Sequence, residues 1–380
     1  MRAVVPEDTT VELDVTSSRR RAGWIAGFSA LAASAMLLGL PLERLAHFGR
    51  WFLSNISDAQ YYAHLLPSLG LLAGASLAHW ASMRGMAWRG FPLGCGSGLW
   101  PWMVTSSLLG LLLSNLFWGW TLRSGDWQPT FVCFVSLPAV TVLLYGAGWK
   151  TFTSGAFLGA LLVTPLSLLA VNVICRPLGW PLVVGNALGM AFGTAAGCWL
   201  LNRCAWQRAL PKGTSSFVRA GRCWGLRRVL ADFSEAPFFG NEWASAGLIG
   251  GALLAYWLEP GGSFNGTGWL PGLLAAQALA SGLGVWLWRR QWAKRGWYPT
   301  FVPLVSVVPA AILTHGPGWP VIVLSATCGA VIAPPLAVAI SSRLPAYVHC
   351  MVGNVASMAI STLLIVPCIG LAVEATAKTF

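Results

Sequence analysis

The chain has 380 residues, of which 56% are hydrophobic and 9% are charged, and its formal net charge is +12. A water-soluble domain of this size could not cover its surface with so few charges, so the composition excludes that class. Lys and Arg form short clusters at the ends of apolar segments rather than one continuous face, which argues against nucleic acid as a partner. We therefore expect an all-α polytopic membrane protein whose main partner is the lipid bilayer.

The N-terminal region predicts a tail followed by an extra span. Residues 1–22 are rich in Glu, Asp and Thr and are interpreted as a disordered cytoplasmic tail. Arg19 to Arg21 then precede an apolar run, which is typical of a secretory signal or of a first transmembrane helix. We favour an uncleaved span at 23–42, with an outside loop to residue 60, because no soluble domain follows it.

Ten further apolar segments have the length of membrane spans. A helix needs about 20 mostly apolar residues to cross the hydrocarbon, where its backbone must satisfy its own hydrogen bonds. The count is therefore about 11 transmembrane helices. Besides 23–42, the predicted spans are 61–82, 92–120, 128–148, 152–174, 180–202, 244–259, 268–288, 298–315, 319–341 and 346–372.

The loop charges predict the orientation of these spans. Basic residues concentrate in alternate loops and in a linker at 203–243, as the positive-inside rule requires of cytoplasmic segments. The N-terminus is then cytoplasmic and the C-terminus outside, and we expect the plasma (inner) membrane of a bacterium. Anionic lipid could bind the basic residues of 203–228, although a topological anchor is the simpler interpretation.

Self-comparison predicts two related halves, 61–202 and 244–380. Trp127-Gln-Pro-Thr-Phe131 matches Trp297-Tyr-Pro-Thr-Phe301 at an offset of 170 positions (297 − 127). Near the ends, Gly185-Asn-Ala-Leu-Gly-Met190 matches Gly353-Asn-Val-Ala-Ser-Met358 at an offset of 168 positions (353 − 185). Each half holds five predicted spans, an odd number, so the halves should insert with opposite topology as a 5+5 inverted repeat.

The first of these motifs predicts a solute site formed by two broken helices. Trp-x-Pro-Thr-Phe opens the third span of each half, where a proline is also compatible with a simple helix start. Pro138 in one copy, and Pro303 and Pro309 in the other, lie deeper and should free backbone carbonyls. The predicted substrate-binding residues of the two spans are Pro129, Thr130, Phe131, Ser136, Pro299, Thr300, Phe301 and Ser306.

The second motif adds two amides to the predicted site. Asn186 and Asn354 occupy matching places in the fifth span of each half, where each serves either a solute or helix packing. His349 lies in the turn before Asn354 and completes the set. All twelve acidic residues fall in the tail, loops or span ends, which argues against a proton relay through carboxylates in the membrane.

These features predict alternating-access transport of a small polar or neutral solute around a midplane site. A channel or facilitator of the same plan is one alternative, and a membrane enzyme acting on a lipid is another. We find no convincing catalytic set, no metal site among the nine Cys residues and no cofactor motif, and we leave the coupling ion open. A homo-oligomer is compatible with the sequence.

Overall fold

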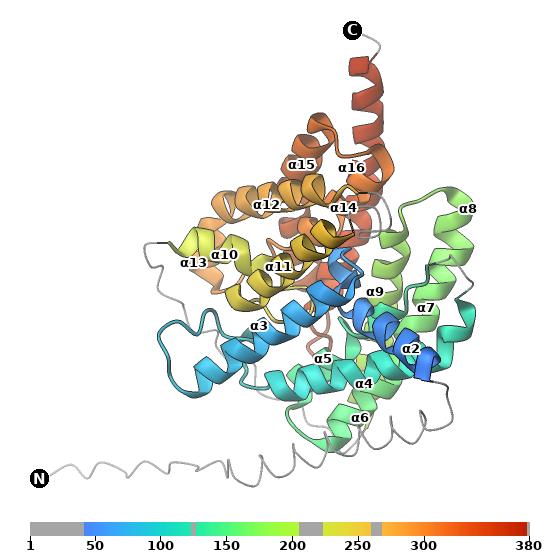
Figure 1. Ribbon diagram of the computed structural model, residues 1–380, viewed down its shortest axis with the longest axis vertical. Helices are drawn as coiled ribbons and strands as arrows, with labels where there is room; N and C mark the ends of the chain where they lie inside the picture. Colours follow the sequence, from blue (N-terminus) through green and yellow to red (C-terminus); the bar gives the residue numbers. More distant parts are fainter. Residues whose placement is uncertain (1–41, 123–126, 205–222, 260–267, 378–380) are drawn as a thin grey trace, which may run out of the picture. The chain divides into compact units, whose positions relative to one another are not determined.

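The computed structural model describes residues 42–122, 127–204, 223–259 and 268–377, and every regular element in them is helical (Figure 1). Contacts divide the chain into two units, 1–47 and 48–380. The predicted tail and nearly all of the predicted span at 23–42 lie outside the described residues. Most of the basic stretch at 203–228, interpreted as a topological anchor or a lipid site, also lies outside the described residues.

Among the described residues, six helices are long and apolar enough to cross a membrane. Each coincides with a predicted span, and the long apolar helices are consistent with an integral membrane protein. α6, α7 and α8 form one continuous helix with two π-helical segments. The six are α4 (Trp100–Trp118), α6 to α8 (Trp149–Leu178), α9 (Leu182–Asn202), α12 (Leu270–Leu287), α15 (Trp319–Ser341) and α16 (Met351–Ala377).

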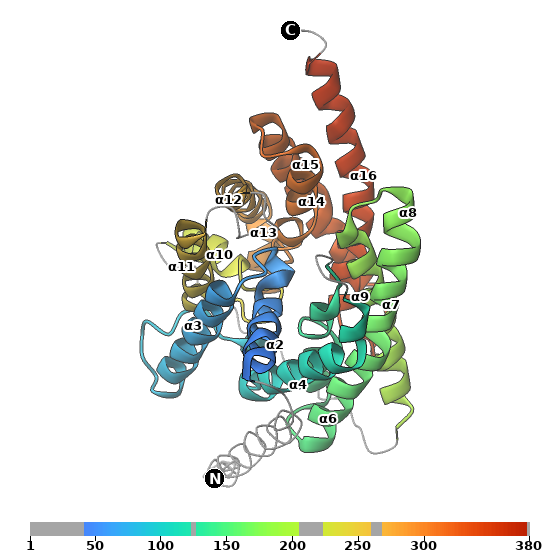
Figure 2. The same cartoon turned by 45° about the vertical axis from the view of Figure 1, so that its right-hand side comes forward.

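Two somewhat less apolar or shorter helices, α3 (Leu65–Met83) and α11 (Glu242–Leu258), pack side by side (Figures 1 and 2). Their backbones touch at glycines, because a Cβ on Gly70 would overlap the carbonyl oxygen of Gly247, and a Cβ on Gly247 that of Gly70. The contact is reciprocal, and it requires that neither residue carry a side chain.

Similar glycine-to-backbone contacts occur one helical turn away, on both sides of the Gly70–Gly247 contact. A Cβ on Gly74 would overlap the carbonyl oxygen of Trp243, and a Cβ on Gly251 would overlap that of Leu66. As the residue number rises along α3, it falls along α11, so the two helices run antiparallel. Residues 66, 70 and 74 are each 177 positions before 243, 247 and 251.

The third predicted span of each half is interrupted, as its prolines indicate. Thr130–Cys133 forms a 3-10 turn, Ser136 leaves the helical region (φ −137°, ψ −123°), and α5 (Leu137–Tyr145) follows. In the second half, Ser306 breaks the chain at the matching position (φ −137°, ψ −82°) before α14 (Val307–His315). Helices of nine residues rise only about 14 Å, roughly half of the hydrocarbon thickness.

Side-chain contacts recur at the offset of 170. The indole nitrogen of Trp118 donates to the carbonyl of Ala160 over 2.8 Å, and that of Trp288 donates to the carbonyl of Ala330 over 2.8 Å. These bonds tie α4 to the continuous helix of the first half and α12 to α15. Matching residues therefore hold matching helix pairs together.

Three shorter helices lie in segments interpreted as loops or linker: α2 (Leu42–Ser54), α10 (Trp224–Asp232) and α13 (Arg289–Arg295). α10 leads into a folded turn at residues 234–241, where Ser234 bonds to Ser245 of α11. The turn after α2 bonds to α3 in the same way, through Ser57 and Ser68. The offset is again 177, so the correspondence begins earlier in each half than the sequence motifs indicated.

The contact between α3 and α11 predicts a position-specific effect of adding one methyl group. Gly70→Ala should lower the apparent melting temperature by several degrees, because the new Cβ meets the facing backbone rather than a movable side chain. Gly250→Ala is the matched control, since nothing lies within 4 Å of its Cβ position on α11. Thermal unfolding in one detergent compares them, and equal stability of both variants would contradict the packing.

Candidate functional site

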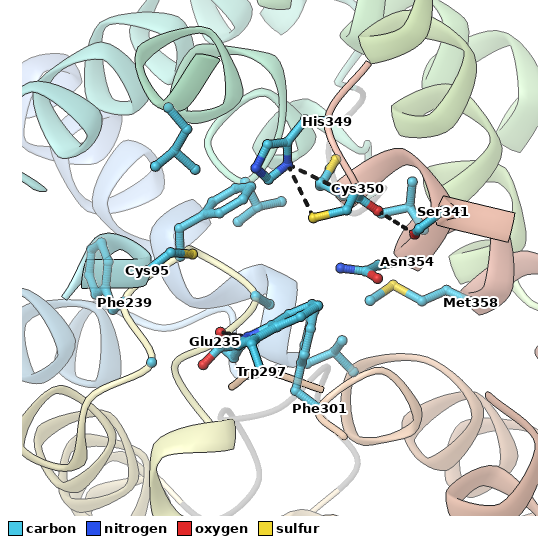
Figure 3. A pocket seen from close by; sticks show the side chains of 18 of the residues that line it. Cys95, Glu235, Phe239, Trp297, Phe301, Ser341, His349, Cys350, Asn354 and Met358 are labelled. Atoms are coloured by element: carbon cyan, nitrogen blue, oxygen red, sulfur yellow. Dashed lines mark hydrogen bonds between the residues drawn. The ribbon is translucent and has the colours of Figure 1, made fainter. Parts of the chain in front are cut away.

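A cavity of about 1040 Å³ lies among residues from both halves. In Figure 3, Asn354 and Met358 project into it from α16, Trp297 and Phe301 from the segment before α14, and Cys95 from the opposite wall. The volume is at the upper end of the range usual for small-molecule sites. The cavity is therefore large enough for an organic molecule rather than only for an ion.

Part of the cavity wall is formed by pairs of residues at matching positions of the two halves. Phe131 and Phe301 come from the two interrupted segments. Each of α9 and α16, which pack together, adds an amide and a thioether, and three more pairs complete the set. The pairs are Phe131 and Phe301, Val135 and Val305, Val183 and Met351, Asn186 and Asn354, Met190 and Met358, and Tyr61 and Phe238.

The two asparagines predicted from the sequence both face this space. Asn186 is 3% exposed and Asn354 is 5% exposed. The Oδ1 atom of Asn186 is buried and has no hydrogen-bond partner among the described residues. An unpaired buried carbonyl oxygen is costly, and a ligand donor would remove that cost.

His349 also lines the cavity, at the start of α16. Its Nδ1 accepts a hydrogen bond from the backbone nitrogen of Met351 over 3.2 Å. The ring also contacts the thiol of Cys350, and Ser341 donates to the Cys350 carbonyl (Figure 3). This arrangement holds the turn before α16 at the edge of the cavity.

The remaining predicted residues do not line the cavity. Thr130, Ser136, Thr300 and Ser306 are all fully buried. The Thr300 hydroxyl donates to Asp232 and the Ser306 hydroxyl to the carbonyl of Val302, whereas the hydroxyls of Thr130 and Ser136 have no partner among the described residues. Pro129 and Pro299 are likewise absent from the lining. In both motifs it is the phenylalanine, one residue after the threonine, that faces the cavity.

A buried ionic cluster stands beside the cavity in the second half. Arg228 bonds to Asp232 over 2.8 Å and to Glu235 over 2.6 Å. Burial opposes the charge of Arg228, but the two carboxylates outweigh it and raise the arginine pKa. Glu235 in turn accepts from the indole of Trp297 over 2.9 Å, which anchors the start of the interrupted segment.

The first half repeats the indole contact without the cation. Trp127 donates to Asp58 over 2.8 Å. The position matching Arg228 at the 177 offset is Trp51, and the position matching Asp232 is Asn55. Burial raises the pKa of Asp58 from 3.8 to about 7, and the Trp127 hydrogen bond only partly opposes this.

The sequence places these acidic residues in loops or at span ends, but in the structure Asp58, Asp232 and Glu235 are buried. The sequence does contain a sign that these two turns correspond. At an offset of 177 positions, two stretches resemble each other: Ser57-Asp-Ala-Gln-Tyr-Tyr-Ala-His64 and Ser234-Glu-Ala-Pro-Phe-Phe-Gly-Asn241. The two stretches also do the same work, since His64 caps α3 and Asn241 caps α11 through their side chains. The substitutions are mostly conservative rather than identical, which made the match less visible than Trp-x-Pro-Thr-Phe.

Comparison with known proteins adds no assignment: no protein-family model matches the chain, and no curated protein matches it either.

The raised pKa of Asp58 predicts a pH-dependent difference between wild type and Asp58→Asn. A folded-state pKa above the unfolded value stabilises the fold at low pH, and this stability is lost as pH rises through about 7. The melting temperature of wild type relative to Asp58→Asn should therefore fall between about pH 4 and 7 and stay level above. Melting curves of both proteins across this range test it, and a constant difference would contradict the burial of this carboxylate.

Proposed function

We propose that the protein transports a small solute across the membrane by alternating access, with the cavity between α9, α16 and the two interrupted segments as the binding site. The observation that carries the proposal is the lining of the deep cavity by matched pairs from the two halves. Transporters with inverted repeats place their site at the repeat interface, next to discontinuous helices. α5 and α14, with their preceding irregular turns, have this form.

We further propose that the halves form an inverted repeat that begins at α2 and at α10. The antiparallel contact of α3 with α11 supports this, because matching residues meet one another across it. The twofold axis that relates these contacts passes between Gly70 and Gly247 and runs nearly perpendicular to both antiparallel helices. If these helices cross the bilayer, that axis lies in the membrane plane, which is the symmetry of opposite insertion.

Much of the cavity wall consists of matching residues from the two halves, but its exposed end does not. We call this end the mouth; its exposed lining residues include Arg289, Arg290, Ala346 and Cys350. Residues 344–351 line the cavity almost continuously, whereas at the matching positions 176–183 only Val183 does. Arg289, Arg290 and Trp292 also line the cavity, and their described counterparts at 119, 120 and 122 do not. By the positive-inside rule, the mouth faces the cytoplasm.

This one-sided mouth favours a transporter over a channel. A channel needs a path open at both ends, at least in its conducting state, whereas alternating access requires a site that reaches one side at a time. Side-chain contacts recur at matching positions in the two halves. If each half adopted the conformation that the other half has here, the cytoplasmic mouth would close and the cavity would open to the other side. The solute site itself would stay in place.

The amide pair gives a direct test of the site. A thermal-shift screen against small metabolites first identifies ligands, since a molecule that binds only the folded state raises apparent stability. For such a ligand, Asn186→Ala should weaken binding about tenfold or more through the lost hydrogen bond and abolish most uptake into liposomes. Asn202→Ala is the control, because Asn202 is exposed on the same helix and does not line the cavity. Equal uptake by both variants would remove Asn186 from the site.

Thiol labelling tests the proposed orientation. With Cys350 as the sole cysteine, a membrane-impermeant maleimide should react in inside-out vesicles and not in intact cells, because this exposed residue lies at the proposed cytoplasmic mouth. Leu178→Cys in a cysteine-free background is the opposite control, since Leu178 is 58% exposed in a predicted outside loop. Labelling of both positions from the same side would contradict opposite insertion of the halves.

A further inference from the structure

The charged residues around the cavity narrow the class of solute. The excess of Lys and Arg over the whole chain reflects topology, but the arginines that line the cavity are a separate observation. Arg228, Arg289 and Arg290 line it, and Glu235 is the single carboxylate among its described lining residues. A molecule that enters therefore meets mainly positive charge.

The three arginines are not equivalent. Arg228 is 5% exposed and is neutralised by Asp232 and Glu235 over 2.8 and 2.6 Å. Arg289 and Arg290 are exposed on the first turn of α13, and neither forms an ion pair within the described part of the chain. Two guanidinium groups at the mouth thus have donors available, and the geometry of such groups suits carboxylate, sulfonate or phosphate oxygens.

Behind this mouth the wall is largely aromatic. Phe238 and Phe239 follow the ionic cluster, Trp297 and Phe301 belong to the interrupted segment of the second half, and Trp224 begins α10. Several of these side chains point into the cavity in Figure 3. Aromatic walls stabilise flat or aliphatic groups by burying apolar area, and a small, strongly hydrated anion gains nothing from them.

The polar groups that α9 and α16 contribute to the buried wall are uncharged amides. Asn186 offers an unpaired carbonyl oxygen, and Asn354 offers a second amide from the matching position of α16. A ligand hydroxyl or amide N–H satisfies Asn186. The lining therefore combines exposed arginines with buried aromatic side chains and two buried amides.

We propose that the cavity binds an amphipathic organic anion, with its acidic group at Arg289 and Arg290 and its apolar body among the aromatic side chains. The inference rests on the proposed transport function and departs from the polar or neutral solute expected from the sequence alone. The same chemistry belongs to a soluble aromatic acid and to the anionic end of a lipid. Steering by the two arginines also raises the local concentration of anions at the mouth.

A probe series with one apolar body and three charges tests the class of ligand. Naphthalene-2-sulfonate, its uncharged sulfonamide and 2-naphthylmethylammonium are titrated into the purified protein, with binding followed by tryptophan quenching. The sulfonate should bind about tenfold more tightly than the sulfonamide, and the ammonium most weakly. Equal affinity for all three, or absence of sulfonate binding, overturns the proposal.

Substitutions on α13 test whether Arg289 and Arg290 cause the preference for an anionic ligand. The double variant Arg289→Gln/Arg290→Gln should lose about tenfold in sulfonate affinity and leave the sulfonamide unchanged. Lys294→Gln is the matched control, because it removes a positive charge from the same helix at an exposed position outside the cavity lining. If Lys294→Gln weakens sulfonate binding as much as the double variant, the effect is general surface charge and the proposal fails.

Two further experiments distinguish a lipid ligand from a soluble one, and test transport separately from binding. Dioctanoyl phosphatidic acid that displaces the sulfonate from wild type but not from the double variant identifies a lipid anion, and failure to displace it identifies a soluble one. Counterflow in liposomes is measured independently. Binding of the anion without counterflow retains this inference and contradicts transport, whereas counterflow of neutral solutes with no anion preference does the reverse.

Discussion

The reciprocal contact of Gly70 with Gly247 is the constraint on which the rest of the arrangement depends. In a bilayer, lipid is as apolar as the helix surface, so close backbone approach and van der Waals packing replace the hydrophobic effect as the source of helix association. At this contact, the absence of two side chains lets α3 and α11 meet along matching residues. The helices that follow each of them then supply matching walls to one cavity.

The ends of the same two helices connect this packing to the site. His64 and Asn241 cap α3 and α11, and the turns before them carry Asp58 and Glu235, which hold Trp127 and Trp297. Each indole opens an interrupted segment, so these carboxylates position the phenylalanines that line the cavity. The second half adds Arg228 as a counter-ion to Glu235, whereas the position 177 residues before it is Trp51.

Much of this architecture could be predicted from the sequence, because apolar length and paired motifs are one-dimensional signals. Asn186 and Asn354 were found through their motif, and both line the cavity. The sequence could not show that Phe131, and not Thr130, lines the cavity. Adjacent residues of a 3-10 turn point in different directions, so a shift of one residue decides which side chain faces the cavity. The ionic cluster of Arg228 was missed for a different reason, because polar residues in a connecting segment are usually exposed, and their burial depends on partners distant in sequence.

A distance measurement across the mouth tests the central claim of alternating access most directly. Spin labels at Ser97 and Ala346, two exposed residues on the rim of the cavity, report its width by double electron–electron resonance in lipid nanodiscs. Alternating access predicts two distance populations, one for an open and one for a closed cytoplasmic mouth, whose ratio changes when ligand binds. A single distance that stays constant with and without a bound ligand would contradict it.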